Sequence, residues 1–153
     1  MLNQVTMMLH VVFGILGILF AVALYVDVLN ASERNLGRVK MTGWIIAACM
    51  VMSFVIGGYW YVLYYPVHRS IIMAGPWPWA HKYFMELKEH LFLTLLILSL
   101  YLPVAVHNSL PLGTKNTRRL ILGLCALIVL LGLFMELSGA IIGESVKMGL
   151  SKR

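Results

Sequence analysis

The sequence has little charge. Only 12% of its 153 residues are charged, whereas 61% are hydrophobic. Soluble domains carry about 25% charged residues, so this composition argues against an ordinary soluble enzyme and favours an integral membrane protein. Twelve Lys and Arg against six Asp and Glu give a net charge of +6. In a membrane protein such an excess lies in loops near anionic lipid, so we do not expect nucleic-acid binding.

Cysteine is also scarce. Cys49 and Cys125 are far apart in apolar runs and form no CxxC pair, which argues against thiol–disulfide exchange and indicates two buried small hydrophobic side chains. The first apolar run has no basic residue before it and is long enough to span a bilayer, so we expect no cleavable signal peptide. The sequence also contains no evident soluble domain.

Four long apolar runs are present instead. Crossing a bilayer takes about 20 helical residues, and backbone polar groups in lipid must be satisfied within the segment. We therefore predict an all-α integral membrane protein, in which residues 1–153 form a single four-transmembrane-helix, up-and-down bundle. The predicted spans are 7–29, 42–65, 84–106 and 120–142.

Three connections separate these runs. The first is short and basic, and the third is basic with turn signals at Pro111 and Gly113. The second, residues 66–82, contains Trp77 and Trp79 and follows a group of tyrosines, which is typical of a water–lipid interface. Basic residues are equally divided between the two sides. Their clustering in the short connections favours termini outside the inner membrane of a bacterial or archaeal cell.

The ionisable residues of the runs gather at one depth. Antiparallel helices place His10, His90 and Glu136 in the same half of the bilayer, with Glu86 just above them, while the other half is almost purely apolar. Small residues at helical spacing mark contacts between membrane helices. We therefore expect four stripes to face the bundle interior. These stripes are His10–Gly14–Gly17–Ala21, Ser53–Gly57–Tyr61, Glu86–His90–Thr94–Ile97 and Gly132–Glu136–Ala140–Gly143.

The leading functional hypothesis is a b-type haem. His10 and His90 are the expected axial ligands on different helices, and Arg69 or Lys82 is expected to pair with a propionate. Helix count and paired histidines resemble small membrane b-type cytochromes. The chain would then be an oxidoreductase subunit that passes electrons between membrane quinol and a partner. Tyr59 and Tyr61 would bound the quinol.

A proton acceptor completes this hypothesis. Glu136 or Glu86 would take the proton of the quinol, because a carboxyl group in apolar surroundings is harder to ionise.

Two alternatives remain open. A single iron, zinc or copper ion is one, with His10, His90, Glu86 and Glu136 as ligands. The other is an accessory or assembly subunit without a cofactor, in which a His10–Glu136 hydrogen bond sets helix register. In every case the expected partners are the lipid bilayer and other membrane subunits or a second copy of the chain, with quinone in the redox case.

Overall fold

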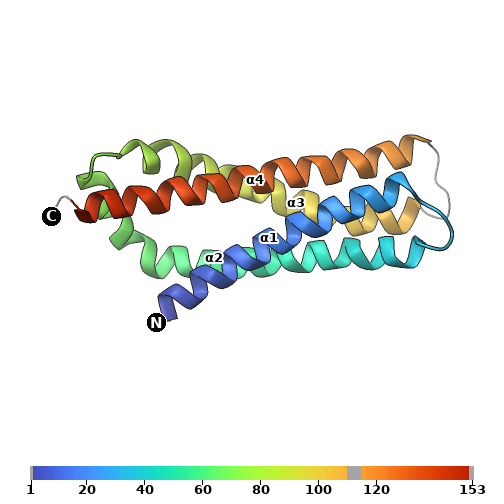
Figure 1. Cartoon of the computed structure of the whole chain (residues 1–153), viewed down its shortest axis with the longest axis horizontal. Helices are drawn as coiled ribbons and strands as arrows, with labels where there is room; N and C mark the ends of the chain where they lie inside the picture. Colours follow the sequence, from blue (N-terminus) through green and yellow to red (C-terminus); the bar gives the residue numbers. More distant parts are fainter. Residues whose placement is uncertain (1, 110–114, 152–153) are drawn as a thin grey trace.

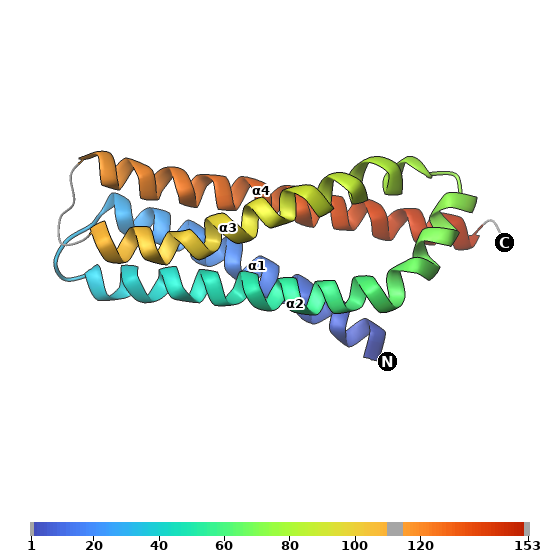
Figure 2. The same ribbon diagram turned by 180° about the vertical axis from the view of Figure 1, so that it is seen from behind.

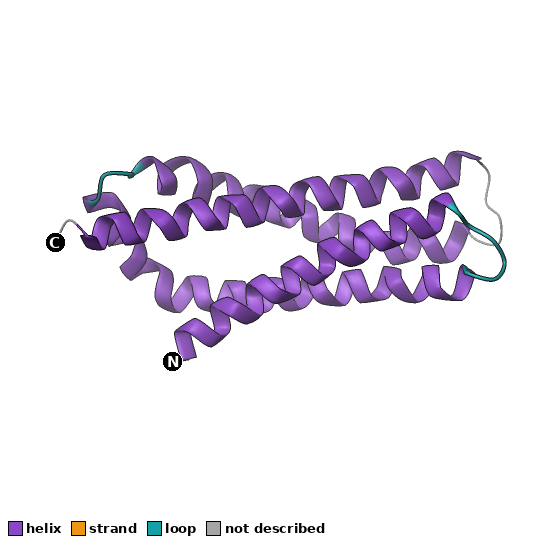
Figure 3. Ribbon diagram, in the orientation of Figure 1, coloured by secondary structure: helices purple, strands orange, loops and turns teal. Residues whose placement is uncertain are grey.

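The structure is a computed structural model of the whole chain, and it describes residues 2–109 and 115–151 (Figure 1). Described residues outside the helices are confined to two short connections, 30–35 and 75–78 (Figure 3). The predicted turn at Pro111 and Gly113 lies outside the described residues. The helices are α1 Leu2–Leu29, α2 Leu36–Ala74, the π-helix η1 Ala80–Met85, α3 Glu86–Ser109 and α4 Lys115–Ser151.

Each of the four predicted spans lies within a helical segment, and all four segments are long and apolar enough to cross a membrane. The helices alternate in direction, and α1 begins at the same end of the bundle at which α4 ends (Figure 1). Helix α1 packs against α2 and α4, and α3 packs against the same two neighbours. The all-helical fold and its up-and-down order are therefore confirmed.

Helix α2 continues beyond its predicted end. It has 39 residues, which corresponds to about 58 Å of helix, so residues 66–74 are helical where the sequence predicts a connection. Pro66 lies inside the helix, where it lacks the N–H for a hydrogen bond to the preceding turn and bends the axis. Past this point α2 turns towards the C-terminal end of α4 (Figure 2).

The bent end of α2 rests directly on α4. A Cβ added to Gly149 of α4 would lie 2.8 Å from the carbonyl oxygen of Ile71, so the two backbones meet at a distance that only glycine allows. Helix α2 therefore contacts α4 at this end of the bundle, although it lies apart from α4 further towards the middle (Figure 2).

The two ends of the bundle differ in packing. We call residues 18–28, 39–50, 95–106 and 121–135 the packed half, because their buried side chains form one large apolar cluster. Gly132 lets α1 and α4 approach here, since a Cβ at this position would lie 2.6 Å from Cγ1 of Ile18. We call the remaining residues of the helices, on the side where α1 begins and α4 ends, the open half.

Candidate ligand cavity

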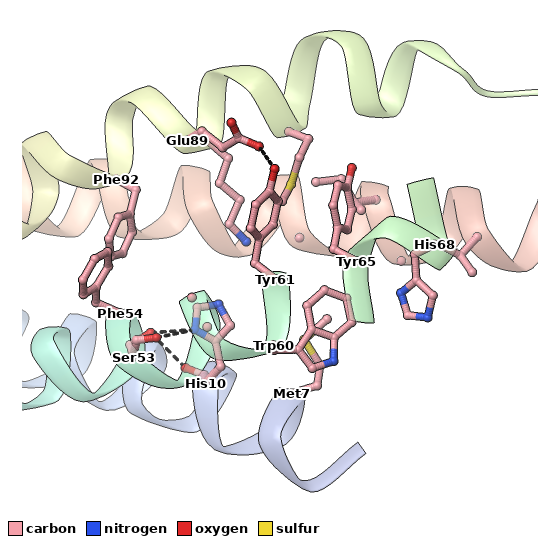
Figure 4. Close-up of a pocket in the computed structure, with 18 of the residues that line it drawn as sticks. Met7, His10, Ser53, Phe54, Trp60, Tyr61, Tyr65, His68, Glu89 and Phe92 are labelled. Carbon is pink, nitrogen blue, oxygen red and sulfur yellow. Dashed lines mark hydrogen bonds between the residues drawn. The ribbon is translucent and has the colours of Figure 1, made fainter. Parts of the chain in front are cut away.

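A cavity of about 440 Å³ lies in the open half. Residues of α1, α2, α3 and α4 line it, together with Met85 of η1 (Figure 4). Glycine contributes to the space, because a Cβ at Gly58 or Gly143 would meet no atom within 4 Å. The cavity is therefore a product of the bend in α2 and of missing side chains on the helices beside it.

Aromatic rings form much of the wall. Phe54 of α2 and Phe92 of α3 stack with ring centroids 4.8 Å apart and an interplanar angle of 11°, and they close the side towards the packed half. Trp60, Tyr61 and Tyr65 of α2 follow towards the other end (Figure 4). Flat apolar walls of this kind suit a flat, apolar ring.

The side chain of His10 on α1 forms hydrogen bonds to α2. Its Nδ1 lies 2.8 Å from the carbonyl oxygen of Ser53 and 3.0 Å from the Ser53 hydroxyl, which itself donates to the His10 carbonyl oxygen at 3.1 Å. The ring lies against Gly57, where a Cβ would be 2.5 Å from Nδ1. The absent side chain of Gly57 therefore makes room for this hydrogen-bonded histidine at the cavity wall.

Lys88 of α3 lines the cavity beside His10. Among the described residues it makes no hydrogen bond and no ion pair within 4 Å, although its ammonium group interacts electrostatically with Glu136 and His10. A second cavity of about 30 Å³, lined by His10, Ser53, Lys88 and Glu136 among others, adjoins them. This volume is sufficient for a water molecule, so Glu136 is within reach of the ligand cavity through one water.

Two tyrosines connect the open half across its helices. The Tyr61 hydroxyl donates to Oε1 of Glu89 at 2.7 Å and so joins α2 to α3. The Tyr65 hydroxyl lies 2.8 Å from Nδ1 of the buried His81 and joins α2 to η1. These bonds hold α3 and η1 beside α2 where apolar packing between the helices is interrupted by the cavity.

Helix α3 is rotated relative to the expected stripe. Glu86 and His90 are both exposed on its outer surface, and Nδ1 of His90 bonds to the carbonyl oxygen of Glu86 at 2.7 Å. The expectation that they face the interior is wrong. The buried face of α3 instead runs through Leu95, Ser99, Leu102 and Val106, and Lys88 lies on the same side, because an apolar core selects aliphatic side chains.

The two expected haem ligands differ in their surroundings. His10 lines the cavity, whereas His90 is exposed and is not among the described residues that line it, so a haem held by this pair stays a prediction. The described residues also contain no group of three or more His, Cys, Asp and Glu side chains placed to hold a metal ion. Arg69 and Tyr59 are exposed and are not among the residues that line the cavity.

The other three predicted stripes agree better with the structure. Gly14, Gly17 and Ala21 are buried on α1. On α2, Ser53, Gly57 and Tyr61 all line the cavity, as a shared inward face requires. On α4, Gly132 is buried, Glu136 faces the small cavity and Gly143 lines the large one. Ala140 is exposed, because the buried face continues through Ser138 and Ile142. The expected His10–Glu136 hydrogen bond is replaced by the bond from His10 to Ser53.

Sequence reasoning did not identify Lys88. A signal was present, since Lys88 precedes Leu95 by seven residues and Ser99 by eleven, which places all three on one helical face. No family model matches the chain, and neither a curated protein nor a solved structure matches it. The cavity itself is therefore the basis for inferring function.

Proposed function

We propose that the chain is an integral membrane protein that binds a quinone-class lipid in the large cavity. The observation that carries this proposal is the cavity of about 440 Å³ with aromatic walls, in which the polar groups include His10 and Lys88, two residues that interact electrostatically. Ligand pockets usually measure about 300–1,000 Å³ and combine apolar walls with a few polar groups. A quinone or quinol matches this pattern, because it has a flat ring, two oxygen atoms and an apolar tail.

The charge of the wall distinguishes this ligand from a phospholipid headgroup. Phosphate sites usually gather several Arg and Lys side chains or the free N–H groups of a helix N-terminus. Lys88 is the single Lys or Arg among the described residues that line the cavity. One cation with a neighbouring carboxylate is better suited to an uncharged ligand that has hydrogen-bonding oxygens.

The helix surfaces support a position in the bilayer. Large hydrophobic side chains are exposed along all four helices, including Leu19 at 58%, Val62 at 69%, Ile97 at 65% and Leu130 at 65%. Such surfaces are stable against lipid and unstable against water. By the proposed orientation, the cavity lies in the outer half of a bacterial or archaeal inner membrane, where a membrane-dissolved quinone reaches it laterally.

Glu136 is the proposed proton acceptor. It lines the small cavity together with His10 and Lys88, so one water can connect it to a ligand hydroxyl group. Glu86 is on the outer surface of α3 and does not line either cavity. With this arrangement the chain serves a quinol-linked oxidoreductase as its quinone-binding subunit.

Binding is tested by fluorescence and by mass spectrometry. Purified protein in lipid nanodiscs is titrated with short-chain ubiquinone, which quenches nearby tryptophan. We expect saturable quenching that is mostly lost in Trp60→Phe, because Trp60 lines the cavity, and retained in Trp44→Phe, because Trp44 is 59% exposed in the packed half. Organic extracts of native protein should also contain stoichiometric quinone. Quenching that never saturates, with no quinone in the extract, would refute the proposal.

A second candidate is an accessory subunit of a larger membrane complex. Glu86 and His90 are exposed on the outer face of α3, and ionisable groups at this depth are costly in lipid unless protein or water covers them. A photo-crosslinker at position 90 should capture a partner protein in native membranes, whereas one at exposed Leu130 of α4 should capture lipid. Equal behaviour at the two positions would argue against a partner on this face.

A further inference from the structure

We propose that the cavity selects the reduced, hydroxyl-bearing quinol over the oxidised quinone, and that His10 determines this preference. The inference rests on the proposed function and adds the oxidation state of the ligand. It follows from which hydrogen-bonding role His10 can take towards the cavity.

The hydrogen bond of His10 fixes its tautomer. A carbonyl oxygen can only accept, so the contact of 2.8 Å between Nδ1 and the Ser53 carbonyl oxygen requires the proton on Nδ1. The Ser53 hydroxyl gives its own proton to the His10 carbonyl oxygen and can accept from Nδ1 as well. The neutral ring therefore carries its lone pair on Nε2, which has no partner among the described residues. Figure 4 shows this nitrogen turned away from Ser53.

The surroundings favour the neutral ring. The ammonium group of Lys88 interacts electrostatically with His10, so a second positive charge on the His10 ring in an apolar cavity is unfavourable. Glu136, which lines the small cavity with both residues, balances the charge of Lys88. His10 therefore presents a hydrogen-bond acceptor to the ligand.

The two forms of the ligand differ at this acceptor. A quinol hydroxyl group donates to Nε2, whereas a quinone carbonyl oxygen has no proton and places its lone pairs against that of Nε2. An unpaired buried polar group is costly, so we expect quinol to bind about 10- to 100-fold more tightly. Lys88 does not discriminate, because its ammonium group donates equally well to a carbonyl or a hydroxyl oxygen.

Anaerobic titration of the protein in nanodiscs measures both affinities, with short-chain ubiquinol and ubiquinone as the probes. His10→Phe keeps a ring at this position but removes the acceptor, so the preference should fall to within about 3-fold. Lys88→Met should weaken both forms by a similar factor and leave their ratio intact. Ser53→Ala should also keep the preference, because the carbonyl group that orients His10 remains.

A second measurement reads the tautomer directly in the unmodified protein. Nitrogen-15 NMR of histidine-labelled protein reports which ring nitrogen carries the proton, and a variant is needed only to assign the His10 signal. A protonated Nδ1 with an unprotonated Nε2 supports the inference, and the reverse overturns it. Equal binding of quinol and quinone would also overturn it but leave the proposed function intact. Binding of neither form would refute the proposed function itself.

Discussion

Glycine has opposite effects at two kinds of position in the bundle. At Gly17 and Gly132, neighbouring side chains fill the space, with Met50 and Ile18 occupying the position where a Cβ would be. At Gly58 and Gly143, an added Cβ would meet nothing within 4 Å. The same residue type therefore brings helices together at some positions and leaves space at others. The difference is set by what faces each glycine.

The largest effect is expected at Gly132. In Gly132→Leu the new side chain overlaps Ile18, whose Cγ1 would be 2.6 Å from the added Cβ, and α1 must move away from α4. Overpacking of this kind costs about 1–3 kcal/mol, measurable as a lower unfolding midpoint in a denaturing-detergent titration. Gly123→Leu is the matched control, because Gly123 faces open space on the same helix. Equal destabilisation by both would show that the contact with Ile18 does not determine the effect at Gly132.

A smaller loss is expected at Gly149, where α4 supports the bent end of α2. A methyl group there would lie 2.8 Å from the Ile71 carbonyl oxygen. Gly149→Ala should therefore push the two helices apart and lower the free energy of unfolding by about 1–2 kcal/mol. It should also weaken quinol binding, since Val146, about one helical turn before Gly149, lines the cavity. Gly123→Ala adds the same methyl group to α4 at a position that meets no atom within 4 Å and does not line the cavity, and it should change neither quantity. Its behaving like Gly149→Ala would show that contact with Ile71 is unimportant.

Two adjacent glycines offer a sharper test of the site. In Gly57→Ala the added Cβ would lie 2.5 Å from Nδ1 of His10, which forces the ring off Ser53 and costs roughly one hydrogen bond, about 0.5–1.5 kcal/mol. The preference for quinol over quinone should fall when this hydrogen bond is lost. Gly58→Ala meets no atom and should retain both stability and preference. Anaerobic titration of the pair distinguishes them, and identical ratios would place the determinant of specificity elsewhere.

The smallest effect is expected at the rim of the cavity. Tyr61→Phe removes the hydrogen bond of 2.7 Å to Glu89, but Glu89 is exposed, so the unfolding free energy should change by less than about 1 kcal/mol. The ligand should associate and dissociate faster, because α2 and α3 lose their polar link beside the opening. Stopped-flow fluorescence measures both rates. A large loss of stability would show that the open half depends on this bond more than on its aromatic packing.

The helices were predictable because length and apolarity are local properties of the chain. The inward faces of α1 and α2 were predictable too, since Gly14, Gly17 and Gly57 recur at helical spacing. The face of α3 was not. Ionisable residues near a helix start can lie on its outer side, and Glu86 and His90 do so, whereas the aliphatic residues around Ser99 mark the buried side.

The cavity depends on long-range geometry that no local pattern contains. Pro66 was expected to end a span, but α2 continues through it, because long helices packed on neighbours tolerate an internal proline. The contact between Ile71 and Gly149 joins residues 78 positions apart in the sequence. The hydrogen bond between His10 and Ser53 could not be predicted either, because Glu136 is at a similar depth and is an alternative, charged partner for His10.

The contact between Ile71 and Gly149 also limits how this protein can change during evolution. Inserting or deleting one residue in α2 between Gly57 and Ile71 would rotate everything beyond it by about 100° and move Ile71 off the glycine. Only steps of three or four residues, about one helical turn, restore the register. Variants with larger or smaller cavities are therefore accessible in discrete sizes, each about one turn of helix apart, and ligand tails of intermediate length must be accommodated by side-chain substitutions.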